Sequence, residues 1–156
     1  MGTVENCAPP EAFLVKPEDF AKFYKAPGFI YVIQWGDDGP VKIGQAIDPK
    51  SRMAELQIAN WMQLKLAAAV PVIGPLTPIE KSAHRLAIMH LLSGEWFDTD
   101  PIEAVRYILA AAELCDHPIY TLDETVRIIK EDRTLAAWSQ IDAEKAMRRK
   151  NNGWSD

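Results

Sequence analysis

The sequence predicts a small α/β sandwich, in which helices flank a mainly antiparallel, three-stranded sheet and a helical extension follows at the C-terminus. Three observations predict this class. Two β-rich runs surround a turn of glycine and aspartate, a third apolar run follows one helix later, and two helices open with an Asp-Pro pair. The 156-residue chain is 48% hydrophobic, which suffices for the core of one domain with a modest appendage.

The first two strands are expected to form a hairpin. The runs GFIYVIQW and PVKIGQ are rich in β-branched and aromatic residues, and the GDDG between them suits a tight or bulged loop. Pro40 belongs at an edge or at the first residue of the second strand, because proline cannot donate to a ladder. The later run QLKLAAAVPVI predicts the third strand.

Helices are expected where a proline follows a capping residue. Asp48 is the expected N-cap of a helix over DPKSRMAELQIAN, with Pro49 at its first position. A second helix is expected over TPIEKSAHRLAIMHLL, followed by a short extended piece over GEWFDT. The run DPIEAVRYILAAAELC predicts a third helix with Glu103 at the capping-box position, and further helix is expected beyond it, with a break near Asp132.

These elements divide the chain into a lead-in (1–24), a main domain (25–100) and a helical extension (101–156). The extension carries the apolar run YILAAAELC together with Trp138 and Trp154. Apolar side chains on such helices could join two copies of the chain, so a homodimer through the C-terminal helices is one expectation.

Composition excludes several classes of protein. A net charge of −5 argues against a protein that coats nucleic acid through bulk electrostatics. Two cysteines make neither a disulfide framework nor a metal cluster, so a cytoplasmic location is expected. The N-terminus lacks the basic and apolar regions of a secretory signal, and no apolar stretch is long enough to span a bilayer, so no membrane association is expected.

Five side chains suggest phosphodiester chemistry. Tyr31 and Lys42 lie on the two hairpin strands and can come close if the register places both on one face. Arg52 lies near the start of the following helix, and Glu80 and His84 share one helix face at i, i+4 spacing. A carboxylate could hold a divalent metal ion, cations could neutralise phosphate, and a phenol or amine could orient water.

These residues lie within five short motifs that occur in a familiar order. They are FIYVI, VKIG, DPKSRMAELQ, EKSAH and GEWF, between Gly28 and Phe97. In this order and spacing they resemble the GIY-YIG nuclease superfamily, in particular the branch common in phage and bacterial genomes. The resemblance implies a GIY-YIG-like sandwich over 25–100 and a metal-dependent endonuclease, with DNA favoured over RNA as substrate.

The resemblance also implies catalytic roles. Tyr31 matches the tyrosine of the first motif, which contacts the attacking water or the scissile phosphate. Lys42 stands where the second motif usually has a tyrosine, the proposed general base. Arg52 matches the arginine that stabilises the phosphoryl transition state.

Further roles concern the metal ion and the phosphate. Glu80 matches the glutamate that binds a single Mg²⁺ or Mn²⁺, and His84 matches a supporting histidine of this branch. Gly44 matches a glycine that keeps the backbone open beside the site. Additional phosphate contacts are expected from three basic residues, Lys50, Lys81 and Arg85.

The sequence departs from the family pattern at three positions. Phe29 replaces the glycine of the first motif, although Gly28 is adjacent. Lys42 replaces the second tyrosine, and it could serve as a base only if its pKa fell well below the usual ~10.4 of a lysine. Otherwise Lys42 is a phosphate clamp and Tyr31 or His84 must handle the water. Glu95 stands about where many members carry an asparagine, and its role is open.

Ordinary structural roles compete with these assignments. The letters TPIE form a capping box with Thr77 as N-cap, in which Glu80 would cap the helix and not bind metal. Trp96 and Phe97 are expected in the core. Trp61 could be a stacking platform for a base, but a role in the core or at an interface is the favoured interpretation.

A second function of another class is a catalytically degenerate GIY-YIG scaffold. Such a scaffold would bind nucleic acid or a protein partner, as an inhibitor or regulatory module, without cutting. The missing tyrosine, the negative net charge and the capping-box alternative for Glu80 favour it.

Overall fold

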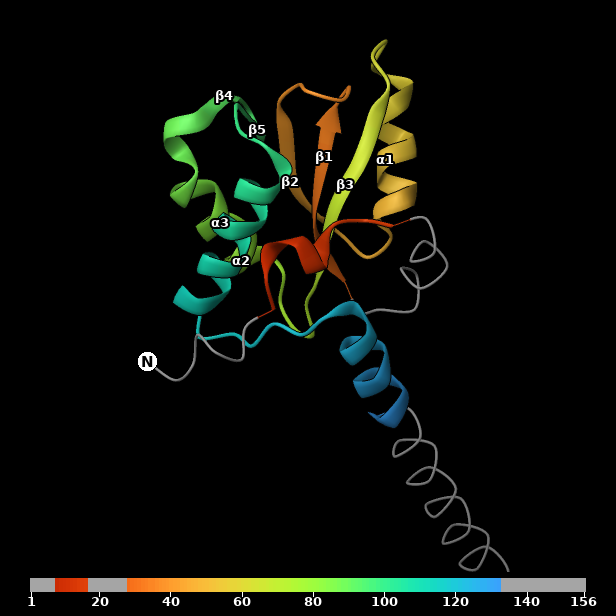
Figure 1. Ribbon diagram of the computed structural model, residues 1–156, viewed down its shortest axis with the longest axis vertical. Coiled ribbons are helices and arrows are strands. Elements are labelled where there is room, and N and C mark those ends of the chain that lie inside the picture. The colour runs from red at the N-terminus through yellow and green to blue at the C-terminus, as the bar shows by residue number, and fades with distance from the viewer. Residues whose placement is uncertain (1–7, 17–27, 133–156) are drawn as a thin grey trace, which may run out of the picture.

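A computed structural model of the chain describes residues 8–16 and 28–132 (Figure 1). Within these residues five strands form one antiparallel sheet in the order β3-β1-β2-β5-β4, and helices cover both of its faces. The predicted α/β class is confirmed, but the sheet has five strands where three were predicted. The strands are β1 (Phe29–Trp35), β2 (Val41–Ala46), β3 (Leu64–Pro71), β4 (Leu91–Ser93) and β5 (Trp96–Phe97).

The two additional strands are too short to show in the sequence pattern. β4 has three residues and β5 has two, so neither shows the alternation that reveals a strand. β5 lies within the piece predicted to be extended, and it pairs Phe97 with Val41 and Trp96 with Lys42 of β2. Pairing with β2, rather than local propensity, makes these residues a strand.

The hairpin register places the expected pair on one face. Tyr31 lies opposite Gly44, and Ile33 lies opposite Lys42. Residues directly opposite one another in an antiparallel pair share a face, as do residues two apart on a strand. Tyr31, Lys42 and Gly44 therefore lie on the same face of the sheet. The loop needs a glycine at Gly36, whose φ is +68°.

Two of the predicted helix starts are confirmed. The Asp48 side chain accepts hydrogen bonds from the backbone N–H groups of Lys50 and Ser51, and the Asp100 side chain accepts one from that of Glu103. The carboxylate of Glu103 itself accepts a hydrogen bond from Arg106 at 3.0 Å. The helices are α1 (Pro49–Ile58), α2 (Thr77–Leu86) and α3 (Pro101–Leu114), with 3₁₀ turns η2 (Pro10–Phe13) and η4 (Ile88–His90).

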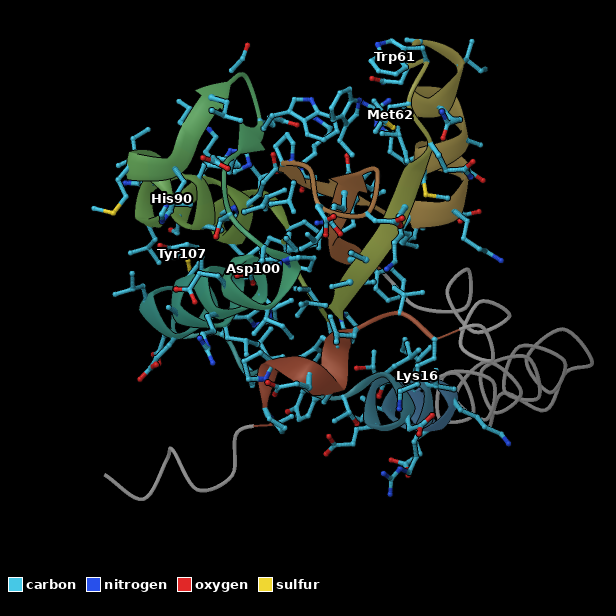
Figure 2. All side chains as sticks on the ribbon, turned by 45° about the horizontal axis from the view of Figure 1, so that its top comes forward. Lys16, Trp61, Met62, His90, Asp100 and Tyr107 are labelled. Carbon is cyan, nitrogen blue, oxygen red and sulfur yellow. The ribbon has the colours of Figure 1, made fainter. Side chains whose placement is uncertain are left out.

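The second predicted helix was extended too far. α2 ends at Leu86, and the chain continues as η4 and β4. Tertiary hydrogen bonds determine this ending: Nε2 of His90 lies 2.9 Å from the Tyr107 hydroxyl on α3, and the His90 carbonyl accepts from the N–H of Asp98 at 2.7 Å. Figure 2 shows His90 and Tyr107 facing each other. The apolar letters of this segment fit a helix equally well, so its sequence does not mark the end.

Two apolar layers fill the space between sheet and helices. On one face, Ile30, Val32 and Ile43 pack with residues of α2 and α3. On the other face, Phe29, Tyr31 and Ile33 pack against α1 and the helix at 122–132. The residues that these helices contribute are Met53 and Leu56 from α1, and Leu122 and Ile129 from 122–132. Figure 1 shows α2 and α3 to one side of β1 and α1 to the other.

Segments outside 25–100 contribute to the same core. Val105 and Ile108 of α3 are fully buried in one core with residues of the sheet, and Phe13 of the lead-in is buried there too. None of the helices in the described ranges has the length and apolar character of a membrane span. Trp138 and Trp154, which the sequence assigns to a dimer surface, lie outside the described residues.

Substitution within α3 tests whether this helix belongs to the core. Ile108→Ala should lower the free energy of unfolding by about 2–5 kcal/mol, because the cavity would be fully buried. Leu114→Ala in the same helix is the matched control, because Leu114 is 70% exposed, and its effect should stay within about 0.5 kcal/mol. Urea unfolding measures both. Equal effects of the two variants would contradict the packing of α3 against the sheet.

Candidate active site

The predicted site residues meet where β5 begins, along the edge of β2. The N–H of Ile43 donates to the Glu95 carbonyl at 3.2 Å. The carbonyl of Ile43 points to the same side of the strand, but its partner is Nε2 of His84 on α2, at 2.7 Å. The N–H and carbonyl of Ile43 on β2 thus bind the turn before β5 and the His84 side chain of α2, respectively.

The ring of Tyr31 lies over Gly44. A Cβ at Gly44 would lie 2.3 Å from the Tyr31 hydroxyl oxygen and 2.4 Å from Cζ, both far inside contact distance. Any other residue at position 44 would therefore displace the tyrosine ring. The glycine of the second motif gives the tyrosine of the first motif its place in the site.

Tyr31 is held as a neutral phenol beside a guanidinium. Its side chain is almost fully buried, and this burial raises the pKa of Tyr31. A hydrogen bond and the charge of Arg52 act in the opposite direction but do not cancel the effect of burial. Arg52 also donates to Glu55 at 3.0 Å, and its side chain is 45% exposed. Tyr31 is therefore suited to donate a hydrogen bond, and Arg52 to meet an anion from solvent.

Lys42 forms an ion pair with Glu95. The side chain of Lys42 is 10% exposed, whereas that of Glu95 is 41% exposed. Glu95 lies in the turn between β4 and β5, and the pairing of Trp96 with Lys42 brings it next to the lysine. The ammonium of Lys42 is already paired with a carboxylate. This pairing favours Lys42 as a positive charge that binds phosphate over Lys42 as a general base.

Glu80 is a largely buried carboxylate whose charge is only partly compensated. Its side chain is 12% exposed, and Oε1 lies 3.9 Å from Nε2 of His84. Its other oxygen, Oε2, is buried and has no hydrogen-bond partner within the described residues. Burial and the nearby Glu95 carboxylate raise the pKa of Glu80, while His84 and Lys42 lower it to a smaller extent.

Glu80 does not serve as a helix cap. The N-cap of α2 is Leu76, whose apolar side chain cannot accept a hydrogen bond, and Thr77 is the first residue of the helix. The Thr77 hydroxyl instead accepts from the side-chain amide of Gln45 on β2, at 3.1 Å. The capping-box alternative is wrong, because the hydroxyl that would close the box binds the sheet.

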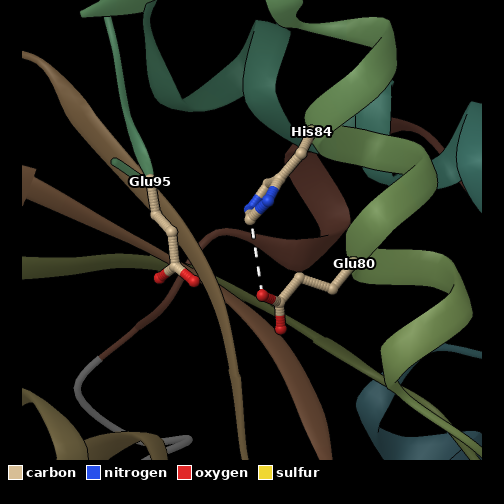
Figure 3. A group of neighbouring side chains, drawn as sticks. All are labelled: Glu80, His84 and Glu95. Carbon is tan, nitrogen blue, oxygen red and sulfur yellow. Dashed lines mark ion pairs between the residues drawn. The ribbon is translucent and has the colours of Figure 1, made fainter. Parts of the chain in front are cut away.

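Three potential metal ligands converge at this point. Ligand atoms of Glu80, His84 and Glu95 all lie within 4.8 Å of one another, and Figure 3 shows the side chains converging from α2 and from the turn before β5. Two carboxylates this close repel each other, and one of them has a buried oxygen without a partner. The residues therefore fit a divalent cation, since carboxylate oxygens are the ligands preferred by Mg²⁺ and Mn²⁺.

Other predicted residues lie around this cluster without joining it. Lys81 and Arg85 are exposed on α2, and Lys50 is half-buried in the first turn of α1. Phe97 is buried, as expected, and its ring centroid lies 5.4 Å from that of His84, whereas Trp96 is only partly buried.

Trp61 is not a core residue. It is 84% exposed and meets the ring of Trp35 edge-on, with 5.4 Å between the ring centroids. Figure 2 shows Trp61 beside Met62 at one end of the molecule.

Glu95 is the site residue that the sequence did not identify. It stands within the GEWF motif, but its position depends on a two-residue strand that pairs with β2. The sequence offered one signal: an acidic residue at a position where an amide is usual.

No protein-family model, curated protein or solved structure matches the chain.

Neutralising Glu80 tests its electrostatic state. A carboxyl group whose folded pKa is raised destabilises the fold when it ionises, so stability is lost as the pH rises from the ordinary value of 4.5 through the folded value. In metal-free buffer at pH 7, Glu80→Gln should raise the melting temperature by about 2–4 °C, the shift that about 1 kcal/mol produces in a chain of this size.

Thermal melts between pH 4 and 8, in steps of about one unit, measure this gain. It should vanish at the acid end, where wild-type Glu80 is protonated as well. Glu113→Gln, at an exposed position of α3, is the control and should show no comparable gain. A gain in Glu80→Gln that did not change with pH would have its origin in packing and not in charge.

Proposed function

We propose that this chain is a metal-dependent endonuclease of the GIY-YIG type, which hydrolyses phosphodiester bonds in DNA. Each of the five motifs that resemble this superfamily contributes a residue to the candidate site, and GEWF contributes Glu95. The family resemblance rests on the motifs, their order and their spacing in the sequence. The backbone of Ile43 in VKIG contacts His84 and Glu95, and Tyr31 lies within electrostatic reach of Arg52, Glu80 and Glu95, which supports the proposal independently of the sequence motifs.

The observation that carries the proposal is the buried carboxylate oxygen of Glu80. Burying a carboxylate without a partner is costly, and proteins retain such groups where a cation or a reaction uses them. On the adjoining face of the sheet stand Tyr31 and Lys42, with Arg52 at the start of α1. Phosphoryl transfer requires groups of this kind: a carboxylate that can bind a metal ion, cations that stabilise the phosphate, and a phenol that can donate a hydrogen bond.

Each residue of the site has its own proposed role in the reaction. Arg52 has an exposed guanidinium, which can bind two oxygens of the scissile phosphate and stabilise the charge that grows on them in the transition state. The phenol of Tyr31, kept protonated by burial, donates a hydrogen bond to the phosphate or to the attacking water. Glu80 would hold a divalent ion, which would supply Lewis-acid stabilisation of the phosphate and the leaving oxygen.

One observation favours the rival function. The Lys42–Glu95 ion pair satisfies both groups without a metal ion, as would suit a scaffold that binds nucleic acid or a protein without cutting it. A divalent ion would give Oε2 of Glu80 the partner that it lacks among the described residues, so hydrolysis is the function that the geometry supports best.

Removing the Glu80 carboxylate should abolish cleavage. Glu80→Ala deletes the proposed metal ligand, so we expect no cleavage of plasmid DNA, single-stranded DNA or RNA in Mg²⁺ or Mn²⁺, while wild type cuts DNA. Glu113→Ala, which removes an exposed carboxylate from α3, should cut like wild type. Circular dichroism confirms that each variant is folded. An active Glu80→Ala protein would refute the metal assignment, and an inactive wild type would favour the binding scaffold.

Removing the Arg52 guanidinium should slow cleavage without preventing folding. Arg52→Ala should lower the single-turnover rate by at least about a hundredfold, the effect of losing one preorganised transition-state donor. Arg106→Ala is a matched control, because Arg106 donates to Glu103 at the same i, i+3 spacing and the same 3.0 Å as Arg52 to Glu55. If the two variants cut at similar rates, Arg52 is an ordinary surface residue.

A further inference from the structure

We propose that Glu95 is a second ligand of the ion at Glu80, and that Lys42 occupies the place of this ion in the metal-free protein. Binding of the ion displaces the Lys42 ammonium from Glu95 and leaves it free for the phosphate. The inference rests on the proposed function for the identity of the ion, but it concerns only how this chain's residues bind it.

The geometry of the two carboxylates supports a shared ion. Glu80 projects from α2 and Glu95 from the turn before β5, and their ligand atoms lie within 4.8 Å (Figure 3). Oxygens that bind one Mg²⁺ at neighbouring octahedral positions lie about 3 Å apart, given bond lengths of about 2.1 Å. A small rotation of the half-exposed Glu95 side chain closes this gap. The partnerless oxygen of Glu80 is already buried in the cluster.

His84 positions the ligands but does not bind the ion through Nε2. A carbonyl oxygen only accepts hydrogen bonds, so Nε2, 2.7 Å from the Ile43 carbonyl, carries a proton in that contact. A protonated nitrogen has no lone pair to offer a metal ion. The contact instead fixes α2 against β2 and thereby aims Glu80 at Glu95. With Nε2 engaged in this way, the proposed ligands are the carboxylate oxygens of Glu80 and Glu95, which suit Mg²⁺ and Mn²⁺.

Lys42 acts as a competing cation. Its ammonium pairs with Glu95, and its charge also acts on Glu80. A divalent ion between the two carboxylates would repel an ammonium at this position, and like charges at such short range cannot both remain. Lys42 shares its face of the sheet with Tyr31, beside Arg52. The displaced ammonium therefore lies where it can form an ion pair with a phosphate bound to Arg52.

Calorimetric titration of the metal-free protein with Mn²⁺ alone, and then with Mg²⁺ alone, tests the exchange. Lys42→Met keeps the length of the side chain and removes the competing charge, so it should bind either ion at least about tenfold tighter than wild type. Glu95→Gln should bind at least about tenfold weaker. Lys65→Met, at an exposed position on β3, is the matched control and should bind like wild type. Thermal melts establish that all variants are folded.

His84→Gln separates a positioning residue from a ligand. The glutamine amide can donate to the Ile43 carbonyl, so ion affinity should stay within about threefold of wild type. A loss of tenfold or more would make the imidazole a ligand and overturn the assignment of an all-oxygen site. Ion binding by Lys42→Met no tighter than that of wild type would overturn the exchange.

The outcomes for ion binding and for cleavage can be told apart. Tighter binding by Lys42→Met together with a wild-type protein that cuts no nucleic acid would support the exchange and refute the nuclease. Cleavage by the wild type, with no change of affinity in Lys42→Met, would do the reverse. If both hold, Lys42→Met should bind the ion better yet cut more slowly, because the phosphate loses a cation.

Discussion

The placement of the Tyr31 ring over Gly44 is the contact on which the site depends. It requires a register in which these residues lie opposite each other, and a slip by one residue would turn every side chain of β2 to the wrong face. With this register, Lys42 lies on the face of Tyr31, and the backbone groups of Ile43 point away from β1. The register of the hairpin therefore determines which cations lie beside Tyr31 and which backbone groups remain for α2 and the turn before β5.

The carboxylates and the cations come from different layers and meet only at the edge of β2. Tyr31 and Lys42 belong to the face covered by α1, whereas α2, which carries Glu80, packs on the opposite face. β5 is short enough to leave the Ile43 carbonyl to His84. A longer β5 would complete the ladder and exclude the helix side chain. The brevity of this strand is thus what allows groups from both faces to lie around one point.

Sequence reasoning reached the parts of the structure that local chemistry determines. The hairpin and the capping aspartates Asp48 and Asp100 follow from strand composition and from proline after an N-cap. Glu95 could not be placed, because its position arises from pairing across the sheet. The end of α2 at Leu86 and the binding of Thr77 to Gln45 likewise depend on contacts distant in sequence. Local pattern cannot decide between competing partners that only the folded chain supplies.

Ile43 joins His84 on α2 to the turn that carries Glu95 through its backbone, while its side chain fills the core. Its identity is therefore free to drift in evolution among residues that fit the same apolar space. Proline is the exception, because it lacks the N–H that binds the Glu95 carbonyl. An essential element of such a site can thus leave no trace in residue identity, and methods that compare side chains will overlook it. Related sites could share this arrangement while their sequences diverge around it.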